Sequence, residues 1–100
     1  MKQKEDAGEI AEERIQRLFD MAEKAAKESD FEQADNCVRM AWKIKLKSRT
    51  RLTSYQKRLF CRRCLKFLAD GKTGKYRTEK GWLLIKCGNC GDVRRFPLSH

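Results

Sequence analysis

The sequence is poor in histidine and, in its second half, in acidic side chains, and it carries no recognisable catalytic motif. Its only histidine is His100, at the C-terminus, where it is a poor candidate for a general base. Residues 41–100 hold just three acidic side chains, Asp70, Glu79 and Asp92, and their spacing matches no metal-hydrolase motif. Neither a P-loop nor a Gly-x-Gly-x-x-Gly motif is present. The chain therefore has no recognisable catalytic residues of its own, and a binding function is expected.

A long apolar run is also missing. No stretch reaches the roughly eighteen apolar residues that a membrane-spanning helix needs, so we expect no membrane partner. The opening residues Met1–Asp6 are mostly charged and no apolar segment follows them, which predicts no secretory signal and a reducing, cytoplasmic location. The 100 residues contain no internal repeat and allow one compact domain or two small subdomains.

Cysteine is the informative residue type. Four of the five cysteines form two Cys-x-x-Cys pairs, Cys61/Cys64 and Cys87/Cys90, separated by 22 residues. Two intervening residues let a tight turn direct both sulfurs at one tetrahedral ion, and the long segment between the pairs has room for a β-hairpin. The pattern predicts a single structural Zn²⁺ held by four thiolates, with no coordination position open to a substrate.

The four paired cysteines could in principle have chemical states other than zinc ligation. Disulfides and reduced thiols are the alternatives, and in a reducing compartment paired cysteines favour a metal over a disulfide. Iron in a rubredoxin-like site uses similar spacing and stays open. Gly88 and Gly91 flank the second pair, where a positive φ or a close backbone approach is expected. The remaining cysteine, Cys37, lies on an apolar helical stripe and is expected to be a small buried hydrophobe.

Residues 9–50 are predicted to form an antiparallel helical hairpin, preceded by a disordered start at 1–8. Apolar residues recur at helical spacing from Glu9 to Lys27 or Glu28. Ser29 and Glu32 match a capping box that would begin a second helix, which runs to about Ser48. Two helices alone make a thin core, so the hairpin is expected to pack against another element or another protein.

Residues 61–98 are predicted to form a zinc ribbon, a small antiparallel sheet built on the metal site, after a basic linker at 51–60. The expected strands are 65–68, 76–78, 82–85 and 93–96, with Gly81 in a turn. Trp82, Ile85 and Phe96 are candidates for a miniature core, although an aromatic side chain here could instead stack on a base. The fold class is thus small α+β.

Charge is unevenly distributed along the chain. Residues 1–40 carry 7 basic and 11 acidic side chains, whereas residues 41–100 carry 17 basic and 3 acidic ones. A strongly basic half fits a phosphate backbone, and the acidic helical half fits solvent or a protein partner. Taken alone, the residues predict a nucleic-acid-binding zinc ribbon with a helical protein-binding arm. A ribbon of the transcription or ribosome machinery and an iron-based electron carrier remain alternatives.

The order of these features resembles one family. A helical hairpin, a basic entry at 57–64 (Lys-Arg-Leu-Phe-Cys-Arg-Arg-Cys) and an exit at 87–97 (Cys-Gly-Asn-Cys-Gly-Asp-Val-Arg-Arg-Phe-Pro) are similar to the archaeal ribonuclease P protein component 4 family over about residues 9–98. Thr53-Ser54 and 69–71 depart from the family's usual prolines, which affects loop geometry and leaves the metal ligands untouched.

The resemblance implies a function and a set of site residues. The family is a protein subunit of the ribonucleoprotein that removes the 5′ leader from precursor tRNA, in which the RNA is the catalyst. With an Sm-like barrel subunit it binds the specificity domain of that RNA and meets precursor tRNA indirectly. Position by position, Leu18, Phe19 and Trp42 would supply core and partner contacts. The implied RNA contacts are Lys57, Arg58, Arg62, Arg63, Lys66, Arg94 and Arg95.

Overall fold

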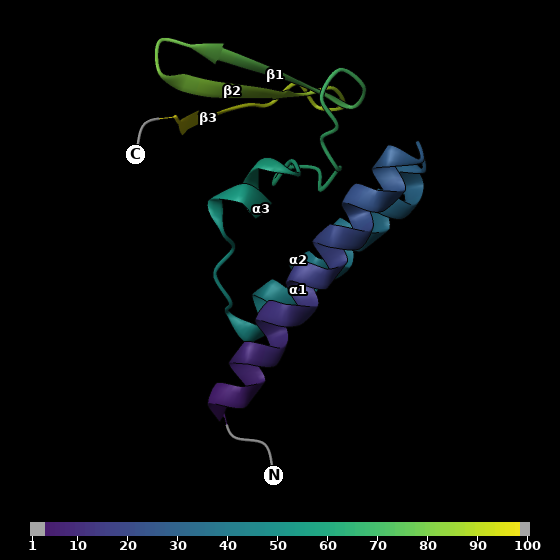
Figure 1. Cartoon of the computed structure of the whole chain (residues 1–100), viewed down its shortest axis with the longest axis vertical. Coiled ribbons are helices and arrows are strands. Elements are labelled where there is room, and N and C mark those ends of the chain that lie inside the picture. Colours follow the sequence, from purple (N-terminus) through teal and green to yellow (C-terminus); the bar gives the residue numbers. More distant parts are fainter. Residues whose placement is uncertain (1–3, 99–100) are drawn as a thin grey trace.

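The computed structural model describes residues 4–98, with side chains from Ile10 onward, and has the predicted α+β architecture (Figure 1). A long helical pair runs diagonally, and a small sheet lies beyond one end of it. None of the described helices is long and apolar enough to cross a bilayer. In chain order the elements are α1 (Lys4–Lys27), α2 (Phe31–Ser48), α3 (Ser54–Arg58), β1 (Gly74–Glu79), β2 (Trp82–Cys87) and β3 (Val93–Pro97).

The helical hairpin is confirmed, but both of its predicted N-terminal boundaries are wrong. α1 begins at Lys4, so residues 4–8 are helical instead of disordered, while 1–3 lie outside the described residues. Helical periodicity could not find this start because the segment has no apolar stripe. Ser29 does not cap α2; its φ of 62° ends α1 in a left-handed turn, with the Ser29 and Asp30 N–H groups donating to the carbonyls of Ala26 and Ala25.

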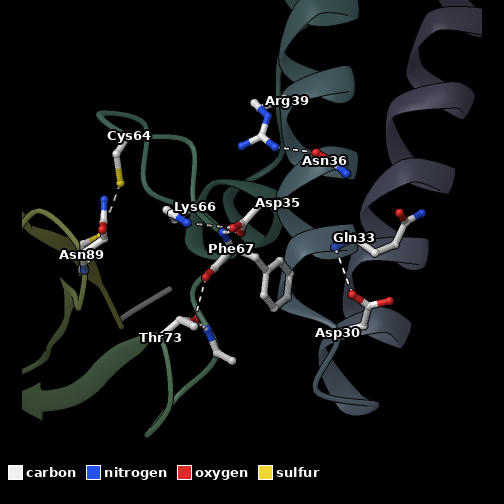
Figure 2. Close-up of polar contacts among 12 residues, drawn as sticks. Asp30, Gln33, Asp35, Asn36, Arg39, Cys64, Lys66, Phe67, Thr73 and Asn89 are labelled. Carbon is white, nitrogen blue, oxygen red and sulfur yellow. Dashed lines mark hydrogen bonds and ion pairs between the residues drawn. The ribbon is translucent and has the colours of Figure 1, made fainter.

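Asp30 is the residue that caps α2. Its carboxylate accepts a hydrogen bond from the Gln33 backbone N–H at 3.2 Å, as Figure 2 shows. α2 then ends at Ser48 as predicted, with Arg49 in a left-handed conformation at the C-cap. The capping box was therefore assigned one residue too early, because serine and aspartate are about equally good N-caps.

The main core joins the hairpin to the start of the ribbon. Facing apolar stripes of α1 and α2 meet Leu59, Phe60 and Phe67 in a single buried cluster. The Phe60 ring lies 5.6 Å from the Phe19 ring and 5.8 Å from the Trp42 ring, measured between centroids. The element that the thin two-helix core required is thus supplied by the chain itself, and the hairpin and ribbon share one core.

The expected linker contains an additional helix, α3. Thr53 and Gln56 form a reciprocal capping box at its start, and the Gln56 amide donates to the Gln16 side chain of α1 at 2.7 Å. The Tyr55 hydroxyl also donates to Glu23 of α1. Conversely, residues 65–68 are not a strand, because they make only an isolated bridge between Phe60 and Phe67.

The sheet has the order β1-β2-β3, antiparallel throughout. A two-residue turn joins β1 to β2, and both of its residues, Lys80 and Gly81, have positive φ, as a type I′ turn requires. Ile85 is buried with Cys61, Leu68 and Cys87, and the partly buried Phe96 packs against this cluster. Trp82 is not in this core: it is 42% exposed, because its position in β2 places it on the face opposite Ile85.

Candidate metal centre and nucleic-acid interface

The four predicted ligand sulfurs form one cluster. The sulfurs of Cys61, Cys64, Cys87 and Cys90 all lie within 4.8 Å of one another. The Cys61–Cys90 and Cys64–Cys87 sulfur pairs are both 3.6 Å apart. A tetrahedral Zn²⁺ with Zn–S bonds of about 2.3 Å requires sulfur pairs roughly 3.8 Å apart, so the cluster fits such an ion. All four positions would be filled by protein.

Each Cys-x-x-Cys pair is held by the same backbone pattern, which we call a knuckle. In the first knuckle, the Cys61 N–H donates to the carbonyl of Lys66, and Leu65 donates back to the Cys61 carbonyl. In the second knuckle, Cys87 donates to Asp92 and Gly91 donates to Cys87 at the equivalent positions. These paired hydrogen bonds curl the chain around each first cysteine and direct the sulfurs inward.

Both glycine predictions around the second knuckle are confirmed. Gly91 has a φ of +79°, and Leu65, its counterpart in the first knuckle, adopts the same left-handed region at 59°. Gly88 meets a close neighbour: an added Cβ would lie 2.8 Å from the Thr73 carbonyl oxygen, which accepts the Gly88 N–H. The second knuckle can therefore lie directly on the loop before β1 only because residue 88 has no side chain.

The thiols differ in their readiness to ionise. Burial raises the pKa of Cys61 to about 12. Burial acts in the same direction on Cys87, but the backbone N–H groups of Cys90 and Asn89 outweigh it and hold the pKa of Cys87 at about 7. Such N–H donors stabilise a thiolate, and a metal ion bound among the four sulfurs would displace the remaining protons.

A buried carboxylate ties the first knuckle to the hairpin. Asp35 of α2 is 6% exposed and accepts the Phe67 backbone N–H at 2.8 Å, while Lys66 places its ammonium 3.1 Å away (Figure 2). Lys66, one of the implied RNA contacts, is therefore occupied within the chain. Sequence reasoning missed Asp35; the available signal was an acidic residue three positions before Val38, beside the apolar stripe of α2.

Several implied RNA contacts meet at the junction of hairpin and ribbon. A cleft of about 250 Å³, the junction cleft, is bounded by α2, the linker, the first knuckle and β3. Three implied contacts, Lys57, Arg62 and Arg94, line it. Lys45 and Arg51 join them, although neither is among the implied contacts. Its apolar lining residues are Trp42, Leu52 and Phe60.

The other implied contacts point elsewhere. Arg58 is half-buried, with its guanidinium 5.7 Å from the Phe96 ring, which also carries Arg94 at 5.4 Å. Arg63 is exposed on the first knuckle, 3.9 Å from the Asp92 carboxylate. Arg95 lies over the Trp82 ring at 5.6 Å. The implied RNA contacts are thus distributed over distinct surfaces.

The implied partner residues also separate. Phe19 is 1% exposed and packs on Phe60, so it contributes to the core and offers no surface to another protein in this conformation. Leu18 and Trp42 are half-buried at the margin of the core, and Lys45 lies 5.2 Å from the Trp42 ring. Cys37 is 1% exposed within the core, and burial raises its pKa, which agrees with a packing role.

Comparison with known proteins identifies this arrangement. Residues 14–91, which include most of the hairpin, all four clustered cysteines and the cleft-lining linker, match the family described as the RNAse P Rpr2/Rpp21/SNM1 subunit domain. The chain belongs to this family. The segment that matches the Rpr2/Rpp21/SNM1 family ends one residue after Cys90. Strand β3 therefore lies outside the matched segment.

Curated members of the ribonuclease P subunit family align along most of the chain. Ribonuclease P protein component 4 of Methanoculleus marisnigri is 36% identical over 91% of this chain and 86% of its own length. The protein of the same name from Methanocorpusculum labreanum is 36% identical over 93% and 86%, respectively. The family resemblance proposed from the sequence is therefore confirmed.

Solved structures of ribonuclease P subunits share the fold. A chain in a cryo-EM structure of archaeal ribonuclease P with mature tRNA superposes with a TM-score of 0.79 and 34% identity, covering 88% of this chain and 76% of that chain. The structure titled Pfu Rpp21 gives a TM-score of 0.59 and 31% identity, covering 85% of this chain and 96% of that one. The helical hairpin, sheet and clustered cysteines thus form a fold known from this ribonucleoprotein.

Proposed function

We propose that this chain is a non-catalytic, RNA-binding subunit of ribonuclease P, the ribonucleoprotein that removes the 5′ leader from precursor tRNA. With a second subunit that has an Sm-like barrel, it would bind and stabilise the specificity domain of the catalytic RNA in the cytoplasm, and meet precursor tRNA indirectly. Membership of the Rpr2/Rpp21/SNM1 family supports this role. The observation that carries it is the junction cleft, where five cations surround an apolar floor.

The chemistry of the junction cleft suits an RNA backbone. Lysine and arginine side chains bind phosphates, and an aromatic floor accommodates ribose or an unstacked base. If the five cations each neutralise one phosphate, affinity should fall with a log–log salt slope of about −3.5 to −4.5. A rise from 50 to 200 mM salt would then weaken binding by about two orders of magnitude.

The metal has a structural part in this proposal. A zinc ion held by Cys61, Cys64, Cys87 and Cys90 would fix both knuckles, leaving no position for water or substrate. Cys61 lies between Phe60 and Arg62, which both line the junction cleft. The ion would therefore also hold these two cleft residues in place relative to the sheet. Leu18 and Trp42 remain the candidates for contact with the barrel subunit, since each keeps part of its surface exposed.

Reconstitution tests the proposal. The full chain and a barrel subunit are added to a ribonuclease P RNA, and precursor-tRNA cleavage is measured at low Mg²⁺. We expect the wild-type chain to raise cleavage and the cleft variant Arg51→Gln/Arg62→Gln to need more protein for the same effect. The matched control Lys24→Gln/Lys27→Gln removes the same amount of charge from the last turn of α1, outside the junction cleft, and should behave as wild type. No stimulation by folded, metal-loaded protein would reject the proposal.

A further inference from the structure

The consecutive residues Arg94 and Arg95 lie on opposite faces of the sheet. Successive side chains of a strand point to opposite faces. Arg94 is on the inner face, where its guanidinium lies 5.4 Å from the Phe96 ring and lines the junction cleft. Arg95 is paired with Leu84 on the outer face, 5.6 Å from the Trp82 ring. The two arginines therefore serve two surfaces that the sheet separates.

The outer face of the sheet is predominantly cationic. The strand register aligns Lys75, Lys86 and Val93 in one row and Arg77, Leu84 and Arg95 in the next. All four cations in these rows are exposed. Among the strand residues of this face the one carboxylate is Glu79, which lies beside Trp82 and 4.0 Å from Arg77. The strand residues of this face therefore include four cations and one carboxylate, and their net charge is positive.

An aromatic ring completes this surface. Trp82 keeps 42% of its surface exposed, because the alternation of side chains along β2 places it on the face opposite the buried Ile85. A protein that binds single-stranded RNA combines exposed aromatic rings, on which bases stack, with cations that track the phosphates. The outer face provides both, whereas an acidic protein partner would need only the charge.

We propose that the outer face, formed by Lys75, Arg77, Trp82, Leu84, Lys86 and Arg95, binds a single-stranded RNA segment distinct from the RNA in the junction cleft. The chain would then bridge two RNA segments. Rows on one face of a strand are about 6.6 Å apart, so the cation rows and Trp82 form a short track with a base platform at one end. This inference rests on the proposed function, because it assumes an RNA-binding subunit.

Binding measurements with the full, metal-loaded chain test the inference. The probes are a ribonuclease P specificity-domain RNA and a short oligouridylate, titrated across salt concentrations. The variants are the outer pair Lys86→Gln/Arg95→Gln, the cleft pair Arg51→Gln/Arg62→Gln, and all four changes together. For the specificity-domain RNA, which can span both surfaces, we expect each pair to flatten the log–log salt slope by about 1.5 and the combination to flatten it by the sum, because separate surfaces act additively.

A stacking variant separates RNA recognition from charge. Trp82→Ala should weaken binding of both probes about tenfold with an unchanged salt slope, because stacking releases no counterions, and Trp82→Phe should restore most of the affinity. If Trp82→Ala and the outer pair bind both RNAs as wild type does while the cleft pair binds weakly, the inference is wrong and the proposed function stands. Unaltered binding by both pairs would count against the proposed function itself.

A protein partner on the outer face would give a different pattern. In that case the outer pair would bind RNA alone as tightly as wild type, yet would lower the affinity for another protein subunit in the reconstituted particle. That result would also overturn the inference. The outer substitutions should leave the metal content and the circular dichroism unchanged, because their side chains are exposed and touch neither core cluster.

Discussion

The carboxylate of Asp35 lies 3.1 Å from the ammonium of Lys66, and this pair joins the N-terminal part of α2 to the first knuckle. The same carboxylate accepts the Phe67 N–H, so one buried acid satisfies two donors from a segment far away in the sequence. A buried carboxylate is costly unless it is paired in this way. Docking of the ribbon on the hairpin thus depends on a polar clasp as well as on apolar packing.

Removing the clasp should loosen the junction. Asp35→Ala leaves the buried Phe67 N–H without its acceptor, and we expect the free energy of unfolding to fall by about 1–3 kcal/mol. Lys66→Ala should cost less, since Lys66 is 43% exposed and the Phe67 hydrogen bond survives. Urea denaturation of the metal-loaded chain measures both, and equal losses from the two variants would contradict this division of roles.

Loss of the metal should affect the hairpin as well as the ribbon. Cys61→Ser, or removal of the metal with a chelator, should unfold residues 61–98, because metal binding in small zinc domains supplies folding free energy on the order of 10 kcal/mol. Since Leu59, Phe60 and Phe67 complete the hairpin core, helical circular dichroism should also decrease. The control is Cys37→Ala, which removes a thiol, leaves all four clustered cysteines in place and puts no polar group into the core. Metal analysis of the purified chain distinguishes zinc from iron, whose ferric thiolate is coloured.

The two glycines of the second knuckle should respond differently to alanine. Gly91→Ala meets only the backbone cost of a positive φ, about 1 kcal/mol, because nothing lies within 4 Å of the added Cβ. Gly88→Ala places its Cβ 2.8 Å from a backbone oxygen and should weaken metal binding more strongly, since the knuckle must move off Thr73. Competition with a metal chelator gives both affinities. A larger loss for Gly91→Ala would refute this ranking.

Tyr76 should make stability depend on pH in the alkaline range. Its hydroxyl donates to the carbonyls of Arg58 and Leu68, and burial raises its pKa from 10.0 to about 12. The folded chain therefore holds this proton more tightly than the unfolded chain. The contribution is full below about pH 10 and is lost as the pH rises through about 12.

Tyr76→Phe provides the matched comparison. The variant should be less stable than wild type by about 1–2 kcal/mol at pH 8, because two carbonyls lose their donor. The difference should narrow at pH 11, because Tyr76 then ionises in the unfolded wild-type chain but stays protonated in the folded one, and the variant has no such group at this position. Paired urea titrations at the two pH values measure this. A constant difference would show that the Tyr76 pKa is the same in the folded and unfolded chains.

Local rules accounted for the ligands and most elements. The Cys-x-x-Cys spacing indicated the four clustered thiols, apolar periodicity located both long helices, and short runs bounded by turn residues located β1, β2 and β3. The prediction of the α2 N-cap was wrong because two adjacent residues, Ser29 and Asp30, are about equally good N-caps and the sequence alone does not rank them. α3 was too short for periodicity, yet Thr53 and Gln56 offered a readable capping box.

The distribution of basic residues could not be deduced from the sequence because it depends on long-range packing. Lys66 is engaged by Asp35, Arg58 packs on Phe96, and Arg62 lines the cleft. Only the fold shows which cation meets a partner within the chain. The alternation of side chains along a strand predicts that Arg94 and Arg95 lie on opposite faces of the sheet. It does not predict which of the two faces the core, because that depends on the register between β3 and β2.

Phe60 and Cys61 share a peptide bond, so the hydrophobic core of the hairpin and the coordination sphere meet without an intervening loop. Among the described residues, no hinge separates helices from sheet at this point, and the Asp35 clasp braces the same joint. The helical hairpin and the sheet are thereby held at one angle to each other by a shared core and the Asp35 contacts. An RNA that folds against them would be selected for conformers whose segments already match that angle.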